Sequence, residues 1–313
     1  MSRRALLGSG ALALPILAAL ALSISAVQGA AAETRVREYW VAAVPITWNV
    51  VPNGHNAIEG ETFPRESTTF SAVAYREFTR GWAQPVPKVN GDQGLQGPLI
   101  RARVGETILV HFLNLDTVFN RPHSMHFHGV EYRFGSDGAY IPGFSGPGAN
   151  VKPGQKFTYR LVAGPESAGV WPYHDHSPTM SDSIGGGLYG ALSILAPREQ
   201  APDREFVVFL ESHLDFMTID GRAFVGNTPV FKARVGDLVQ WDVLALGDDT
   251  HTFHVHGHRW RTPSGAVIDT QTVGPAESFR IRWTEDAPGT WFYHCHVEGH
   301  MMNGMIGIYR VRR

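Results

Sequence analysis

Cysteine is almost absent from this sequence, since Cys295 is the only one among 313 residues. No disulfide can therefore form within the chain, and an exposed thiol would be open to oxidation in an oxidising compartment. An excess of one charge is also lacking, because 27 basic residues face 29 acidic residues. This balance provides no basic field for nucleic acid, so we expect no nucleic-acid partner.

A long apolar segment suited to a membrane is missing as well. The uncharged run over residues 11–27 is shorter than the ~20 residues that a membrane-spanning helix needs. Arg3 and Arg4 precede the run, and three alanines at residues 30–32 end it. This layout predicts a twin-arginine-type signal peptide over residues 1–32, with a membrane anchor as the alternative. We therefore expect an exported protein, either extracellular or in the periplasm or cell envelope.

Helical periodicity is lacking beyond the N-terminal run, whereas turn-forming residues are abundant. The sequence has 34 glycines and 20 prolines, and its short apolar or alternating segments are bounded by Gly, Pro and Asp. Such segments are typical of strands in β-sandwiches. We therefore predict an all-β fold.

The chain also carries one plan twice, which indicates a duplicated domain. Three landmarks recur: ARVGE at 102–106 and ARVGD at 233–237, HSMHFHG at 123–129 and HTFHVHG at 251–257, and WPYHDH at 171–176 and WFYHCH at 291–296. We predict two β-sandwich domains, over residues 34–197 and 203–313, joined by a short Pro-containing linker.

Histidine is over-abundant, with 15 residues. Eight of them form four His-x-His motifs on expected strands: His126 and His128, His174 and His176, His254 and His256, His294 and His296. Side chains alternate along a strand, so both histidines of a pair point to the same side. One such pair is weak evidence for a metal, but four at equivalent places of a repeat are strong. Imidazole suits copper, zinc, iron and nickel.

Cys295 stands between His294 and His296, so the same alternation directs its thiol to the opposite side. It therefore needs a metal of its own, with partners on its own side. His300 and Met305 follow Cys295, and His251 precedes the neighbouring His-x-His motif. Two His, one Cys and a weak Met form the ligand set of blue-copper electron-transfer sites.

These motifs together resemble those of the multicopper oxidases, and the two-domain length resembles the bacterial small laccases. The resemblance implies two cupredoxin-like Greek-key domains in tandem and four coppers per chain. Carried over by motif, the implied ligands are His251, Cys295, His300 and Met305 for type 1 copper, His126 and His254 for type 2 copper, and His128, His174, His176, His256, His294 and His296 for the type 3 pair.

The resemblance also implies an activity and an assembly. A laccase-like enzyme would oxidise phenols or similar one-electron donors at the type 1 copper and reduce O2 to water at a trinuclear cluster. Cys295, His294 and His296 would link the two sites. A homotrimer with clusters at subunit interfaces is implied, although one chain could also close its own cluster. Cu(I) or Fe(II) oxidation, nitrite reduction and non-catalytic copper binding are the alternatives.

One position departs from the repeat, and several roles stay open. Asp175 occupies the place of Cys295, and a carboxylate cannot replace the blue-copper thiolate, so the first domain should lack a type 1 site. Tyr132 and Asp137 follow the first His-x-His motif, where packing competes with a redox or proton-delivery role. His123 and His258 flank ligand motifs, and each could support a ligand from behind.

Overall fold

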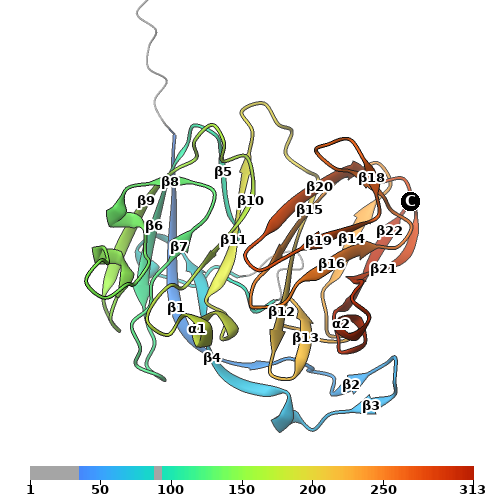
Figure 1. Cartoon of the computed structure of the whole chain (residues 1–313), viewed down its shortest axis with the longest axis horizontal. Coiled ribbons are helices and arrows are strands. Elements are labelled where there is room, and N and C mark those ends of the chain that lie inside the picture. The colour runs from blue at the N-terminus through green and yellow to red at the C-terminus, as the bar shows by residue number, and fades with distance from the viewer. Residues whose placement is uncertain (1–34, 88–93) are drawn as a thin grey trace, which may run out of the picture. The chain divides into compact units, whose positions relative to one another are not determined.

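Strands dominate the fold, as the turn-bounded segments predict (Figure 1). The computed structural model describes residues 35–87 and 94–313, and the predicted signal peptide lies outside them. No helix in the described part of the chain is long and apolar enough to cross a membrane. The helices are α1 (Met180–Gly185) and α2 (Glu298–Met302), with 3-10 turns at Arg65–Ser67, Arg80–Trp82, Phe134–Ser136 and Pro147–Ala149.

Two sheets form the first half of the fold. They enclose a core to which both contribute, with Val110 and Tyr159 from one sheet and Tyr173 and Leu192 from the other. The first sheet has the order β4 (Thr69–Phe78), β1 (Val36–Asn49), β6 (Thr107–Asn114), β9 (Lys156–Val162) and β8 (Glu131–Tyr132). The second has the order β5 (Ile100–Arg103), β11 (Tyr189–Leu195), β10 (Gly169–His174) and β7 (His126–Phe127).

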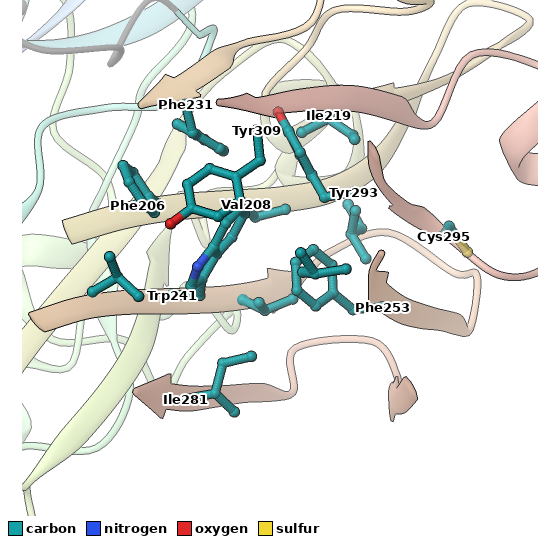
Figure 2. Close-up of a cluster of buried hydrophobic side chains, with 14 of the residues drawn as sticks. Phe206, Val208, Ile219, Phe231, Trp241, Phe253, Ile281, Tyr293, Cys295 and Tyr309 are labelled. Carbon is teal, nitrogen blue, oxygen red and sulfur yellow. The ribbon is translucent and has the colours of Figure 1, made fainter. Parts of the chain in front are cut away.

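Two further sheets form the second half around a core rich in aromatic side chains, with Trp241 and Tyr293 fully buried (Figure 2). One sheet has the order β13 (Phe216–Ile219), β12 (Arg204–His213), β15 (Leu238–Ala245) and β20 (Ser278–Thr284). The other has the order β14 (Val230–Arg234), β22 (Ile306–Arg312), β21 (Gly289–Cys295), β16 (His251–Val255) and β19 (Thr270–Val273). Two short pairs complete the fold: β2 (His55–Asn56) with β3 (Glu61–Thr62), and β17 (Trp260–Arg261) with β18 (Val267–Ile268).

The two halves repeat the same connections, which confirms the predicted all-β sandwich fold. β1 runs parallel to β6 as β12 runs parallel to β15, and β5 runs parallel to β11 as β14 runs parallel to β22. The registers correspond too. His126 lies opposite His174 across β7 and β10, and His254 lies opposite His294 across β16 and β21. The motifs that are far apart in sequence thus become neighbours within each half.

In each half, the first His-x-His motif is followed by a glycine, and the local backbone and packing require it. Gly129 and Gly257 both adopt a positive φ, of 70° and 72°. A Cβ atom at Gly129 would lie 2.0 Å from the Trp171 ring, and one at Gly257 would lie 2.9 Å from the Trp291 ring. A larger residue would therefore be strained in its backbone and would displace the tryptophan that precedes the second His-x-His motif.

β15 is buried on both faces because the first half covers its outer face. Val239, Trp241 and Val243 point into the core of the second half. On the other face, Leu244 packs against Tyr189, and Asp242 forms a 2.8 Å ion pair with Arg280. The Arg280 guanidinium also donates to the Ile194 carbonyl of the first half, at 2.9 Å. The two halves are thus joined by apolar contacts and by a hydrogen bond from Arg280, whose charge is paired with Asp242 within the second half.

Candidate metal centres

The alternation along β21 divides its C-terminal end between two environments. Cys295 is fully buried and belongs to the core cluster of the second half, where Figure 2 shows it at the edge of the aromatic side chains. His294 and His296 instead contact the ring of His254 on the neighbouring strand. The expectation that the thiol and the two imidazoles face opposite sides is confirmed.

Three potential soft-metal ligands converge on the thiol side. Cys295 Sγ lies 3.8 Å from His251 Nδ1 and 3.7 Å from His300 Nδ1, and the two ring nitrogens are 3.1 Å apart. The ligand atoms of all three lie within 4.8 Å of one another. Met305 is fully buried, and its backbone N–H donates to the His300 carbonyl at 3.0 Å. Thiolate and imidazole nitrogens in this arrangement fit a copper ion.

Burial has opposite effects on the pKa values of the imidazole and the thiol at this site. Burial and the neighbouring His300 lower the pKa of His251 to about 4, so its imidazole is neutral at neutral pH. Burial raises the pKa of the Cys295 thiol, and the Thr252 backbone N–H donates to its sulfur at 3.4 Å. A bound cation would offset the cost of a buried thiolate, so metal binding and proton release are coupled here.

The other face of the same strands carries four imidazoles. His254, His256, His294 and His296 form this second-half set, with ring centroids 5.2 to 5.5 Å apart. His256 Nε2 and His294 Nε2 approach to 3.1 Å. The ligand atoms of His254, His256 and His294 lie within 4.8 Å of one another. This concentration of ring nitrogens is suited to metal ions.

The first half repeats this arrangement. His126, His128, His174 and His176 form the first-half set, with ring centroids 5.1 to 5.8 Å apart. His128 Nε2 lies 3.1 Å from His174 Nε2, which is the same distance as in the second half. Burial, with a smaller contribution from the neighbouring histidines, lowers the pKa of both imidazoles to about 4.

Backbone carbonyls fix the tautomer of four of these imidazoles. His126 and His254 each donate Nδ1–H to the carbonyl of a following loop, of Asp137 at 2.7 Å and of Asp269 at 2.6 Å. In the second motif of each half, His174 donates Nδ1–H to the Asp175 carbonyl at 2.9 Å, and His294 donates to the Cys295 carbonyl at 2.8 Å. A neutral imidazole that donates from Nδ1 keeps the Nε2 lone pair for a metal.

The two imidazole sets make no ring contact with each other across residues 35–87 and 94–313, since every ring contact among these eight histidines lies within one set. The halves pack through other surfaces, such as the cluster of Tyr189, Phe209 and Leu244.

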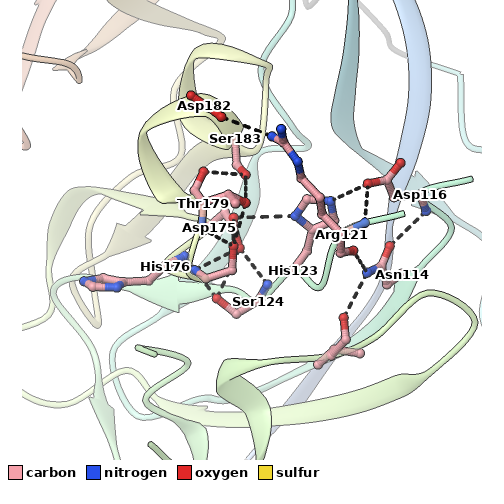
Figure 3. Close-up of polar contacts among 12 residues, drawn as sticks. Asn114, Asp116, Arg121, His123, Ser124, Asp175, His176, Thr179, Asp182 and Ser183 are labelled. Atoms are coloured by element: carbon pink, nitrogen blue, oxygen red, sulfur yellow. Dashed lines mark hydrogen bonds and ion pairs between the residues drawn. The ribbon is translucent and has the colours of Figure 1, made fainter. Parts of the chain in front are cut away.

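Asp175 lies where the repeat predicts, at the position that Cys295 occupies in the second half, and the structure shows its partners (Figure 3). It is fully buried and accepts the Ser124 N–H at 2.7 Å and the Ser177 hydroxyl at 2.6 Å. His123 Nδ1 lies 3.5 Å from Asp175 and its Nε2 3.1 Å from Asp116. Burial alone would raise the pKa of Asp175, but the bonds from His123, Ser177 and Ser124 outweigh it and lower that pKa.

Tyr132 and Asp137 both lie beside the first-half set. The Tyr132 and His126 ring centroids are 6.1 Å apart, and Asp137 Oδ1 lies 3.6 Å from His126 Nδ1. Burial raises the pKa of Tyr132, and the nearby Asp137 carboxylate raises it further. These positions are compatible with proton delivery, and the roles stay predictions.

His258 supports the second-half set from behind through a partner that motif analysis did not find. His258 Nδ1 donates to the His256 carbonyl at 2.7 Å, and its Nε2 lies 3.1 Å from the buried Glu285 carboxylate. Burial would lower the pKa of His258, but the Glu285 bond outweighs it and raises that pKa. No local pattern marks Glu285, because its partners His258 and Tyr309 are distant in sequence.

A buried Cys-His-His triad beside a set of imidazoles is the ligand chemistry of copper oxidoreductases. Two family models described as multicopper oxidase match adjoining parts of the chain, residues 72–199 and residues 199–313. The chain therefore belongs to the multicopper oxidase family.

Similar proteins have several named activities. A "Probable nitrite reductase-hydroxylamine oxidoreductase fusion protein" of Kuenenia stuttgartiensis is 32% identical over 273 residues, covering 79% of this chain and 30% of that protein. The "Ferroxidase HEPHL1" of Homo sapiens is 29% identical over 347 residues, covering 88% and 29%. This chain thus spans about 30% of the length of these curated relatives. The solved structure of a "Blue Copper Oxidase from Nitrosomonas europaea" matches with a TM-score of 0.68 at 22% identity, over 88% of this chain and 86% of that one. That match confirms the cupredoxin-like fold.

Proposed function

We propose that this protein is a laccase-like multicopper oxidase. It would take single electrons from phenols or similar small donors at the Cys295 site and pass them to O2, which is reduced to water. The observation that carries this proposal is the split environment of one strand end, with Cys295 on one face and His294 and His296 on the other. Four coppers per chain would supply the redox chemistry: one type 1, one type 2 and two type 3.

The protein's own residues hold the ligands in place and link the two sites. Backbone bonds connect Cys295 directly to His294 and His296, and the His294 Nδ1–H bond to the Cys295 carbonyl adds a second contact. The Thr252 N–H donates to the Cys295 sulfur, and the low pKa of His251 keeps that ligand neutral. These features would orient the ligands before copper binds. They would thereby reduce the movement of the ligands when the copper ion gains or loses an electron.

Metal-ion oxidation is the second candidate, because relatives are named ferroxidases. Acidic side chains lie near the Cys295 site: Asp249 acts electrostatically on His251, and Glu298 is exposed at the start of α2. We favour organic donors over Cu(I), because the chain has seven methionines and no Met-rich insertion that would bind this soft ion.

The copper-loaded protein tests the function and the substrate together. We expect four coppers per chain and a blue colour that a reductant bleaches and air restores. We also expect a higher kcat/KM on a dimethoxyphenol than on Fe(II) or Cu(I). A preference for Fe(II) or Cu(I) would favour the metal oxidase, nitrite consumption would favour a nitrite reductase, and zinc or a single copper would contradict the oxidase.

We further propose that the protein is exported and that it forms a homotrimer, in which the first-half set of one chain meets the second-half set of the next. The separation of the two sets within one chain supports this assembly, and cyclic closure completes every cluster. Light scattering after gel filtration should give three times the chain mass for the copper-loaded protein. An active monomer with four coppers would contradict the trimer.

A further inference from the structure

We propose that Asp116, His123 and Asp175 form a buried polar triad that positions the first-half imidazole set for metal. In the second half, a metal ion bound by Cys295 would hold the equivalent strand ends together. In the first half, the triad would hold them without an ion. The inference rests on the proposed function, since it concerns how half of the three-copper cluster is held.

The repeat places this triad at the equivalent of the Cys295 site. His123 is the counterpart of His251, since each stands three residues before the first histidine of a His-x-His pair. Asp175 is the counterpart of Cys295. Met180 follows His176 by four residues, as His300 follows His296, so no third imidazole is available there. At the place equivalent to the Cys295 site, the first half thus has an imidazole, His123, and a carboxylate, Asp175, instead of the thiol.

The triad is shielded from water. Asp116 and Asp175 are fully buried, and His123 is 2% exposed. Both ring nitrogens of His123 face carboxylate oxygens, with Nε2 3.1 Å from Asp116 and Nδ1 3.5 Å from Asp175. Asp116 also accepts the backbone N–H groups of Val118, Phe119 and Arg121, which fixes the loop before His123.

Short chains of hydrogen bonds connect the triad to the ligands (Figure 3). The Ser124 hydroxyl lies 3.2 Å from Asp175 Oδ1 and accepts the His176 backbone N–H at 3.0 Å. The Asp175 carbonyl accepts Nδ1–H of His174, which directs Nε2 of that ring toward His128. Asp175 also accepts the Ser124 N–H, two residues before His126. One carboxylate residue therefore holds both strand ends that carry the set.

Asp175→Asn is the direct test, because it preserves size and removes the charge. An amide nitrogen cannot accept a hydrogen bond, so the bond from either the Ser124 N–H or the Ser177 hydroxyl would be lost. Asp182→Asn is the matched control: Asp182 lies on the adjacent α1 with a side chain 69% exposed and pairs with Arg121 at the surface. Both variants are made in the full chain and loaded with copper.

For Asp175→Asn we expect an intact blue colour from the Cys295 site and an affinity for cluster copper that is lower by about 10- to 100-fold. The type 2 electron paramagnetic resonance signal should weaken. The Asp182→Asn control should keep four coppers, the blue colour and the type 2 signal. If Asp175→Asn does not fold, Ser124→Ala removes only the hydroxyl link to His176 and should cause a smaller loss of the same signal. Ser124→Ala with unchanged cluster copper would then overturn the proposal.

The outcomes separate this inference from the proposed function. A wild-type protein without blue colour or cluster copper would contradict the function itself. A blue wild type whose Asp175→Asn variant binds cluster copper as tightly as Asp182→Asn would overturn the positioning triad and leave the function standing.

Discussion

Replacing Cys295 with serine is expected to abolish the blue colour and lower turnover by at least a factor of about 100. Loss of a residue that only hydrogen-bonds to a metal ligand costs up to about 100-fold, and loss of the ligand itself should cost at least as much. A hydroxyl is a poor soft-metal ligand, so the type 1 copper would lose its only thiolate. His294 and His296 keep their positions, because β21 pairs with its neighbours through backbone groups and a serine oxygen can also accept the Thr252 N–H. Copper content should therefore fall from four to three per chain.

Met302→Leu provides the matched control for this variant. Met302 is a half-buried residue of α2, near His300 in sequence and outside the proposed ligand set. It should keep the blue colour and four coppers. Absorption spectra, copper analysis and phenol oxidation at saturating O2 compare the three proteins. A Cys295→Ser protein that stays blue, or turns over like the wild type, would contradict the assignment of the type 1 site.

The sequence alone could predict how the histidines and Cys295 are arranged in each half, because that arrangement is local. Strand alternation separates Cys295 from His294 and His296, and the repeat places His126 opposite the second motif of its own half. The alternation depends only on neighbouring residues. The placement of His126 depends on a strand pairing that occurs in both halves. The same reasoning predicts that Asp175 stands in place of the thiol.

The supports behind the ligands could not be predicted in this way. Asp116 and Glu285 become important only because folding buries them beside His123 and His258, and no spacing announces either contact. The separation of the two imidazole sets depends on how the halves pack, through side chains such as Leu244 and Tyr189. Packing of this kind is set by shape and is not encoded in a local pattern.

Replacing Glu285 with glutamine should destabilise the metal-free protein by about 3–5 kcal/mol, the usual cost of removing one partner from a buried ion pair. The Glu285 carboxylate accepts from His258 at 3.1 Å, from the Trp283 indole at 3.0 Å and from the Tyr309 hydroxyl at 2.5 Å. His258 already donates Nδ1–H to the His256 carbonyl, so an Nε2 that faces a carboxylate must be protonated as well. The variant leaves that charge buried and without its counter-ion.

The pH dependence of this loss distinguishes the ion pair from a simple packing defect. The pKa of His258 is raised from 6.5, so its contribution to stability is complete below about 6.5 and is lost as pH rises through the folded pKa. The pKa of Glu285 is lowered from 4.5 to about 2, so its contribution is complete above about 4.5 and is lost as pH falls toward 2. The difference between wild type and Glu285→Gln should therefore be greatest between about pH 4.5 and 6.5.

Urea unfolding of the copper-free proteins across this pH range measures the difference, and removing copper keeps ligand binding from adding to the apparent stability. Glu166→Gln is the control, since Glu166 is an exposed acid in the loop that precedes β10 as Glu285 precedes β21. It should change the free energy of unfolding by less than about 0.5 kcal/mol at every pH. A Glu285→Gln loss that does not vary with pH would show that the side chain acts through packing. The charge of the pair would then have no part in fixing the His256 carbonyl.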